Sequence, residues 1–342
     1  RLVLLNIDED FISTGNVNVD ATTIKAAKTF NANGVTKTVR GTVDGESANA
    51  AGIGLIVVNS GDDATKILTF EGAVGSTNQI DQITLTTEAT FAADVSSDGI
   101  DIANTTTGKF AGNLTLGAAD LTLGGTASIA DFNGTTTQTI IGGAAAEMID
   151  GTGIVNISNT STGGVVFGTH AKLSVNTLQL KLAANARATV SNVSNVVKDI
   201  TTLSGSVIVL DDTIADTNTI FTTTDTLTED SIHVDSHIKM PSNFDSGETV
   251  KLFVDTLVGD IDAIIADVNS ALVDTGLVNY VATKDSDDVI VTATETTDAG
   301  AVAKLGVNTN SAKALRQARD AMLATASGID SLSNILSLEN GI

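Results

Sequence analysis

The sequence predicts a mainly β protein, a β-solenoid of the parallel β-helix kind followed by a small α+β region. Three features support this prediction: short alternating strands at even spacing, a long internal repeat, and a composition of small and β-branched residues. Hydrophobic residues make up 42% of the 342 residues, but aromatic residues make up only 3% and Pro occurs once. Val, Ile and Thr suit a pleated surface, and a chain with so little Pro leaves strand hydrogen bonds intact.

Residues 1–14 are predicted to form an N-terminal strand that contacts another subunit. They open with RLVLLNIDED, an aliphatic run that ends in an acidic turn. No initiator Met or signal peptide is present, so we expect the chain to be a processed piece of a longer protein. A strand at the end of a solenoid presents unpaired backbone groups, which a second subunit could pair.

Two imperfect copies of one unit follow, over residues 15–97 and 112–194, and a truncated third copy is indicated at 205–214. GNVNVDATTIKAAKTFNANG in the first copy corresponds to GNLTLGAADLTLGGTASIADFNG in the second. Further matches keep the same order: TKTVRG with TQTIIG, GIGLIVVN with GTGIVNIS, QIDQITL with SVNTLQL, and ATFAADVS with ATVSNVS. We therefore expect a repeated structural unit rather than a duplicated catalytic site.

Each copy has the pattern strand, turn, strand, with about 8 to 12 residues between turn signals. Val17 and Val19 alternate with polar residues, as Leu114 and Leu116 do, so one face of each strand is expected to be buried. This pattern predicts a β-solenoid over residues 15–230, and an all-β sandwich is the alternative. With roughly 20 residues per coil and strands about 4.8 Å apart, the rod would be on the order of 50 Å long.

Residues 231–342 are predicted to form an α+β domain or a cap on the rod. Pro241 precedes an amphipathic helix in which Ile261, Ile264 and Val268 recur at helical spacing. The helices are expected at 259–276, near 298–306, at 310–327 with Asn310 or Ser311 as N-cap, and at 328–338, with strands at 277–283 and 287–295.

The chain is strongly acidic, with 41 Asp and Glu against 18 Lys and Arg and a formal net charge of -23. Such a chain repels phosphate backbones and anionic lipid, so nucleic acid is excluded as a partner. Because Cys is absent, disulfides and thiolate metal sites are excluded. No apolar run reaches the length of about 18 residues that a membrane helix needs.

Two patterns bear on metal binding, and neither leads us to predict a metal site. His233, Asp235 and His237 would face the same way on a strand, but a fourth ligand is missing and a solvated strand is favoured. Acidic residues also cluster at predicted turns, where Ca²⁺ is the alternative to simple solvation, although no calcium-loop spacing is present. These acidic residues are Asp8, Glu9, Asp10, Asp62, Asp63, Asp211, Asp212, Asp285, Asp287 and Asp288.

No catalytic or cofactor-binding residue is predicted, and the chain is expected not to be an enzyme. The pairs Gly52 and Gly54, and Gly151 and Gly153, read as turn glycines, because the third Gly and the helix of a dinucleotide site are missing. The three His residues fit no serine-nucleophile motif. Tyr280 is the single Tyr and the ten Phe are interpreted as scattered, so an aromatic platform for sugar rings is not expected.

The stretches GNLTLG and LTFEGAVGSTNQI resemble the passenger region of bacterial autotransporters. The tail, KMPSNFDSGETVKLF and IIADVNSALVDTGLVNYVAT, resembles the segment that such proteins carry between the passenger and the membrane barrel. The likeness is to the surface antigens of rickettsiae and other alphaproteobacteria in particular. It implies export through the outer membrane, a β-helical stalk, and a role as adhesin, surface layer or appendage. The membrane barrel of such proteins is not part of this sequence, so the outer membrane is expected to be involved only through a removed anchor.

We therefore predict a non-enzymatic extracellular structural protein at the bacterial cell surface. Its rod is expected to assemble head-to-tail into a filament or appendage, because the N-terminal strand edge is open to a second subunit. The alternatives are a monomeric adhesin that binds a host or cell-surface ligand, and a polysaccharide-acting β-helix enzyme.

Overall fold

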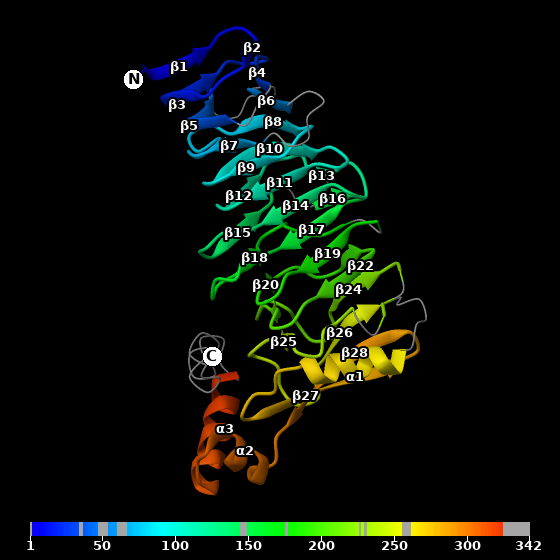
Figure 1. Ribbon diagram of the computed structural model, residues 1–342. Coiled ribbons are helices and arrows are strands. Elements are labelled where there is room, and N and C mark those ends of the chain that lie inside the picture. The colour runs from blue at the N-terminus through cyan, green and yellow to red at the C-terminus, as the bar shows by residue number, and fades with distance from the viewer. Residues whose placement is uncertain are drawn as a thin grey trace.

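A computed structural model describes residues 2–33, 37–46, 54–59, 67–143, 149–174, 177–225, 227–228, 231–254 and 261–323. The protein is mainly β, with long parallel sheets that coil into a solenoid and a small α+β region at the C-terminal end (Figure 1). The predicted fold class is confirmed. None of the helices in these ranges is long and apolar enough to cross a membrane.

The first face of the solenoid is a parallel sheet of ten strands in the described part of the chain. Each strand pairs with the strands of the coils before and after it, so the sheet runs along the rod. In order they are β1 (Leu2–Ile7), β3 (Val17–Ile24), β5 (Lys37–Gly45), β7 (Leu68–Phe70), β9 (Ala89–Phe91), β11 (Thr107–Phe110), β14 (Ile129–Phe132), β17 (Ile154–Ile157), β19 (Gln179–Leu182) and β22 (Asp199–Thr202).

The other two faces meet in β10 (Val95–Ile102), which bends around a corner of the rod. The first half of β10 pairs with β12 and begins the second face, whereas its second half pairs with β8 and β13 on the third face. The second face continues through β12 (Leu114–Leu116), β15 (Gln138–Ile141), β18 (Val165–Phe167), β20 (Arg187–Val190), β23 (Val207–Leu210) and β25 (His237–Lys239).

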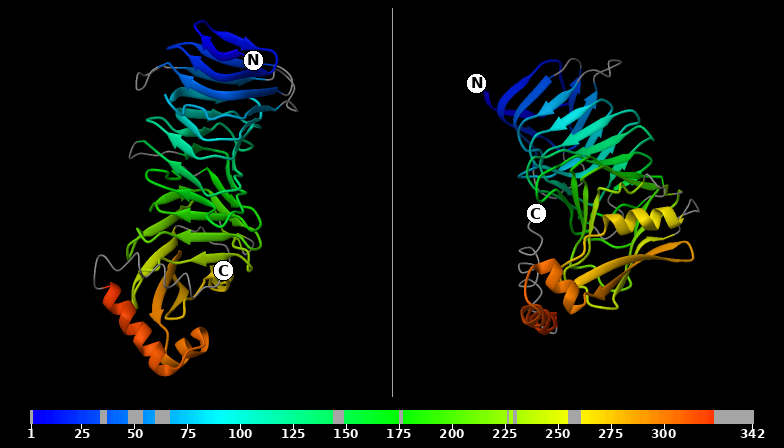
Figure 2. Two further views of the ribbon diagram at one scale, coloured as in Figure 1. Left: turned by 90° about the vertical axis from the view of Figure 1, so that its left-hand side faces the viewer. Right: turned by 60° about the horizontal axis from the view of Figure 1, so that its bottom comes forward.

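The third face contains two groups of parallel strands that isolated bridges connect near Leu173 and Ser174. The first group is β2 (Phe11–Ser13), β4 (Thr29–Asn33), β6 (Leu55–Asn59), β8 (Ile80–Leu85), β13 (Leu121–Leu123) and β16 (Ile149–Gly151). The second group is β21 (Asn195–Val197), β24 (Thr219–Thr223) and β26 (Thr249–Val254), to which β28 (Asp288–Glu295) and β27 (Val278–Asp285) add in antiparallel order. Figure 2 shows the three faces from two further sides.

A ladder of Phe side chains runs inside the first face. Phe70, Phe91, Phe110 and Phe132 occupy the same register position on β7, β9, β11 and β14, and all are fully buried. Successive ring centroids lie 5.0, 5.3 and 5.4 Å apart. Interpreting these Phe residues as scattered was therefore wrong, because coils of about 20 residues bring them to one inner position.

The two sequence copies occupy different faces of the rod. The first-copy segments in β5 and β9 lie on the first face, but their partners in β15 and β20 lie on the second. Likewise β6 and β8 lie on the third face, and their partners β17 and β19 lie on the first. Each strand of the second copy thus lies one face further around the rod than its counterpart in the first copy. The repeat preserves the strands and their inward apolar residues, but not the face on which each strand lies.

The parallel coils continue past residue 230, where the sequence pattern places the end of the solenoid. β25 pairs in parallel with β23, and β26 with β24. Helix α1 (Ile261–Ala271) then lies across the C-terminal end of the rod and buries Ile264 and Val268 in the common core (Figure 1). The predicted amphipathic helix at 259–276 is therefore confirmed in a shorter form.

A helical hairpin of α2 (Asp298–Leu305) and α3 (Thr309–Leu323) follows the sheet. Asn308 caps α3, because its Oδ1 accepts a hydrogen bond from the Ser311 N–H at 3.0 Å, so neither predicted N-cap is the right one. Arg319, 4% exposed, attaches α3 to the rod by donating to the Asp245 carboxylate at 3.1 Å and to the Phe244 carbonyl. The helix predicted at 328–338 lies outside the described residues.

Candidate functional site

The predicted metal-binding trio does not lie along one strand. The Ser236 N–H donates to the His233 carbonyl at 2.8 Å, which closes a turn, and only His237 belongs to β25. Inside that turn the Asp235 N–H donates to His233 Nδ1 at 3.1 Å. The expectation of a shared strand face was wrong, because this segment turns a corner of the rod. Within the described ranges no three His, Asp or Glu side chains are grouped to hold a metal ion.

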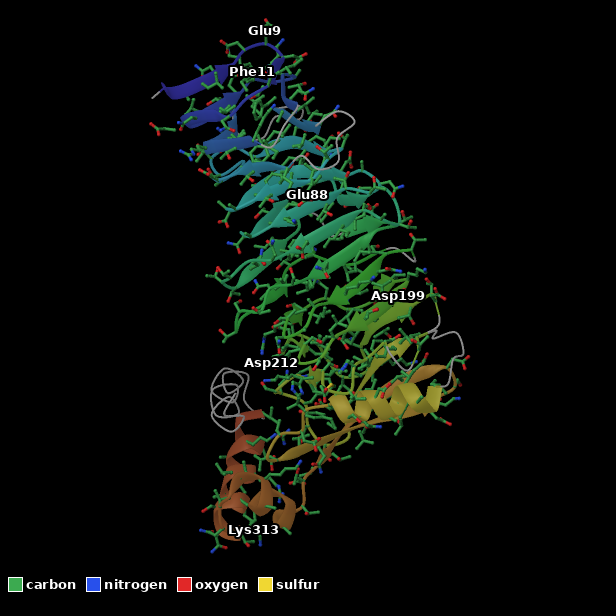
Figure 3. All side chains as sticks on the ribbon, in the orientation of Figure 1. Glu9, Phe11, Glu88, Asp199, Asp212 and Lys313 are labelled. Atoms are coloured by element: carbon green, nitrogen blue, oxygen red, sulfur yellow. The ribbon has the colours of Figure 1, made fainter. Side chains whose placement is uncertain are left out.

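Several of the acidic turn residues hold one coil to the next. Asp10 Oδ1 accepts a hydrogen bond from the Thr29 N–H in the following coil at 2.9 Å. Asp212, labelled in Figure 3, accepts from the N–H of Ser242 at 2.6 Å and from its hydroxyl at 2.8 Å. These oxygens satisfy backbone donors at the corners. Sequence reasoning missed this role, although an Asp or Asn recurring at a coil corner is the signal for it.

Three other acidic turn residues form ion pairs, and Asp211 Oδ1 accepts from the Thr213 N–H at 3.0 Å within its own turn. Asp8 pairs with Lys25 at 2.8 Å, and Glu9 pairs with Lys28 at 2.9 Å. Near the hairpin, Lys251 pairs with Asp288 at 2.9 Å. Asp62 and Asp63 lie outside the described residues.

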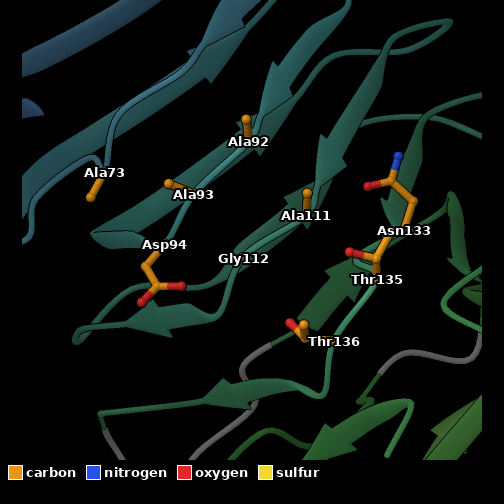
Figure 4. Close-up of a pocket in the computed structure, with 9 residues that line it drawn as sticks. All are labelled: Ala73, Ala92, Ala93, Asp94, Ala111, Gly112, Asn133, Thr135 and Thr136. Atoms are coloured by element: carbon orange, nitrogen blue, oxygen red, sulfur yellow. The ribbon is translucent and has the colours of Figure 1, made fainter. Parts of the chain in front are cut away.

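Two depressions lie side by side at the corner between the first and second faces, and Figure 4 shows the residues that line one of them. One measures about 430 Å³ and is lined by Ala73, Ala92, Ala93, Asp94, Ala111, Gly112, Asn133, Thr135 and Thr136. A second, of about 490 Å³, shares Ala73 and Asp94 with it and extends over the second face. Together they form a shallow groove along the rod.

Small residues form this groove because successive corners stack backbone on backbone. A Cβ atom at Gly112 would lie 2.3 Å from the carbonyl carbon of Ala93, so only Gly fits there. Asp94 is the single carboxylate in the lining, and its Oδ1 accepts from the Asn113 N–H at 2.8 Å. The described lining contains no Lys, Arg, His or aromatic residue, so the groove offers neither an acid–base pair nor a stacking platform.

The described members of the two glycine pairs lie at strand ends or between strands, with Gly153 between β16 and β17. Gly54 and Gly151 have φ of +70° and +100°, which a residue with a side chain rarely adopts. Gly54 leads into β6, and Gly151 ends β16. Gly52 lies outside the described residues.

Asp199 on the first face is held in a partly buried position (Figure 3). Its Oδ2 accepts from Gln179 Nε2 at 3.1 Å, whereas its Oδ1 is buried without a hydrogen-bond partner. Burial raises the pKa of the Asp199 carboxyl above its ordinary value, although Lys198 and Lys181 act in the opposite direction. Ionisation of this group therefore destabilises the fold.

We expect Asp199→Asn to raise the thermal unfolding midpoint at about pH 7, because the amide stays neutral. The wild type is penalised as pH rises through the raised pKa, so the difference should vanish at about pH 3, where the acid is protonated in both states. The comparison variant is Asp131→Asn, since Asp131 Oδ1 accepts from Asn156 at 2.7 Å and from Ser158 at 2.6 Å. It should lower the midpoint. Equal effects of both variants at neutral pH would contradict this account of Asp199.

Comparisons of the chain with protein-family models, with curated proteins and with solved structures gave no significant match.

Proposed function

We propose that this chain is a non-enzymatic structural rod, a β-solenoid stalk that is closed at its C-terminal end and extends from its N-terminal edge. The observation that carries this proposal is the difference between the two ends. Ten stacked strands about 4.8 Å apart give the described first face a length of about 43 Å. One continuous apolar core fills the rod and reaches α1.

The C-terminal end is closed because side chains occupy the outer edge of β27. Asn269 of α1 acts there as a strand would: its Oδ1 accepts from the Ala282 N–H at 2.8 Å, and its Nδ2 donates to the Ala282 carbonyl at 3.0 Å. Asp274 Oδ1 accepts from the Tyr280 N–H at 2.7 Å. Covering an edge in this way prevents it from pairing with another chain.

The second face is closed at the same end. Its last strand, β25, receives a backbone hydrogen bond at the Ile238 carbonyl from the Val273 N–H at 3.0 Å. On the first face, the Thr202 N–H of β22 donates to the Ser231 carbonyl at 2.9 Å. All three faces thus end on groups from the same chain.

The N-terminal edge differs. Among the described residues β1 pairs only with β3, and β2 only with β4. Each of these two strands also exposes an apolar side chain, Leu4 at 47% and Ile12 at 60% accessible. A further coil from the same polypeptide or from a partner would continue both sheets, so growth at this edge fits the fold.

This asymmetry favours a stalk over the head-to-tail filament, because a filament needs an acceptor at both ends. The described groove lining offers neither an acid–base pair nor an aromatic platform, which favours a structural role over a polysaccharide-acting enzyme. The resemblance to autotransporter passengers supports placing the stalk at the bacterial cell surface. An adhesin would use the same stalk to present a binding tip.

Negative-stain electron microscopy and light scattering of the purified protein test the proposal. We expect short rods of uniform length at all concentrations, without and with a chelator. Long filaments in the wild type would contradict the proposal that the C-terminal end is closed. Filaments that still form after deletion of residues 1–12 would show in addition that the N-terminal edge is not needed for assembly. Collapse of the rods on chelation would show that Ca²⁺ holds them together.

The cap on β27 can be tested by Asn269→Ala. The variant frees the Ala282 N–H and carbonyl on an edge strand, so we expect association into dimers or larger species that rises with concentration. Ser270→Ala is the matched control, because the Ser270 hydroxyl bonds only within α1, to the Ala266 carbonyl at 2.9 Å. Light scattering after gel filtration measures the mass. A monomeric Asn269→Ala variant would show that the edge needs no cap.

A further inference from the structure

Two cations lie on the outer surface of the second face, two strands apart. Arg187 begins β20 and Lys239 ends β25, with β23 between these strands. The register aligns Arg187 with Val207 and His237, and Thr189 with Val209 and Lys239. Since the residues that alternate with them are buried, the side chains in both rows point outward: Arg187, Thr189, Val207, Val209, His237 and Lys239.

Among the described residues neither cation has a carboxylate partner. Several other cations of this acidic chain form ion pairs, such as Lys109 with Glu88 and Lys304 with Asp274. Arg187 and Lys239 form no ion pair or hydrogen bond through their side chains within the described structure. Two like charges therefore face one surface without neutralisation, in a protein whose formal net charge is -23.

Their surroundings make this arrangement unfavourable without a counterion. Both side chains are partly buried, and burial lowers the pKa of each. The charge of Arg187 lowers the pKa of Lys239 further. Val207 and Val209 lie between them and supply no polar atom from their side chains. An anion placed between the two cations would offset the free-energy cost of burying the two charges and the repulsion between them.

We propose that Arg187 and Lys239 bind a single phosphate group, with Val207 and Val209 as the apolar floor of the site and His237 at its border. A guanidinium group presents paired donors to two phosphate oxygens, and an ammonium group adds a compact charge. The overall negative charge repels polyanions, so the ligand is a small phosphate compound rather than a nucleic acid. Leu203 and Val234, 47% and 54% exposed, lie at neighbouring corners of the rod. Because exposed apolar side chains could contact lipid, a phospholipid headgroup is a second source of the phosphate group, which the experiment must distinguish from free phosphate.

Calorimetric titration of the full chain with inorganic phosphate at low salt tests the site. We expect saturable binding that Arg187→Gln and Lys239→Gln each weaken at least about tenfold. Lys181→Gln is the matched control, since Lys181 is an outward, partly buried lysine on the first face. It should leave the affinity unchanged, and circular dichroism should show all variants folded.

A second arm uses phosphatidylcholine vesicles with and without phosphatidylglycerol. Binding to the anionic vesicles that is lost in Arg187→Gln, without binding of free phosphate, would assign the phosphate to a lipid headgroup. The proposal is overturned if the wild type binds neither probe, or if Lys181→Gln weakens binding as much as the two site variants do.

Discussion

Phe110→Ala should lower the free energy of unfolding by about 3 to 5 kcal/mol. Phe110 is fully buried at the centre of the ladder, with ring centroids 5.3 Å from Phe91 and 5.4 Å from Phe132. The variant leaves a cavity that the stacked coils cannot close, because the strand spacing is fixed by backbone hydrogen bonds. Guanidinium unfolding followed by far-ultraviolet circular dichroism measures the loss, since the chain contains no Trp.

Phe11→Ala is the matched control for the ladder. Phe11 lies in the first described coil, is only partly buried and stacks on Phe30 alone, at 5.9 Å. We expect this variant to lower the free energy of unfolding by about 1 kcal/mol or less. Hydrogen exchange should locate the damage of Phe110→Ala in β9, β11 and β14 and leave β23 and β25 protected, because coils interact mainly with their neighbours. Equal losses for the two variants would contradict a ladder that stabilises the middle of the rod.

Gln138→Ala should lower the free energy of unfolding by about 3 kcal/mol or more, because it removes a buried polar side chain that joins several backbone groups. Gln138 is 1% exposed. Its Nε2 donates to the carbonyls of Phe110 at 2.8 Å and Gly112 at 2.9 Å. Its Oε1 accepts from the Gly134 N–H at 2.8 Å and from Asn159 Nδ2 at 2.9 Å. All four partners would lose this hydrogen bond at a corner of the rod.

Gln82→Ala provides the comparison, because Gln82 points outward from β8 and makes one long contact, 3.5 Å from the Ile83 carbonyl. Gln82→Ala should lower the free energy of unfolding by less than about 1 kcal/mol. The two variants are compared by their unfolding midpoints in guanidinium. If Gln138→Ala were as mild as Gln82→Ala, the corner would have to accept water in place of the side chain.

The strands, and the side of each strand that is buried, follow from local patterns in the sequence. Val17, Val19, Leu114 and Leu116 were expected inside and are at most 7% exposed. Alternation along a strand is a local property with a period of two, so it can be read from a few residues. The same holds for α1, whose apolar residues recur at helical spacing.

The features that act between coils were decided by the tertiary structure. The Phe ladder, the Asn269 cap on β27 and the pair of Arg187 and Lys239 join residues of different coils or elements. Their alignment depends on how many residues form the corners of each coil, and this number varies along the chain. A change at one corner shifts every later residue relative to the coil before it, as β10 shows by bending from the second face to the third. Composition and alternation therefore specify a solenoid, whereas the packing of one coil on the next decides which side chains meet and where an edge is closed.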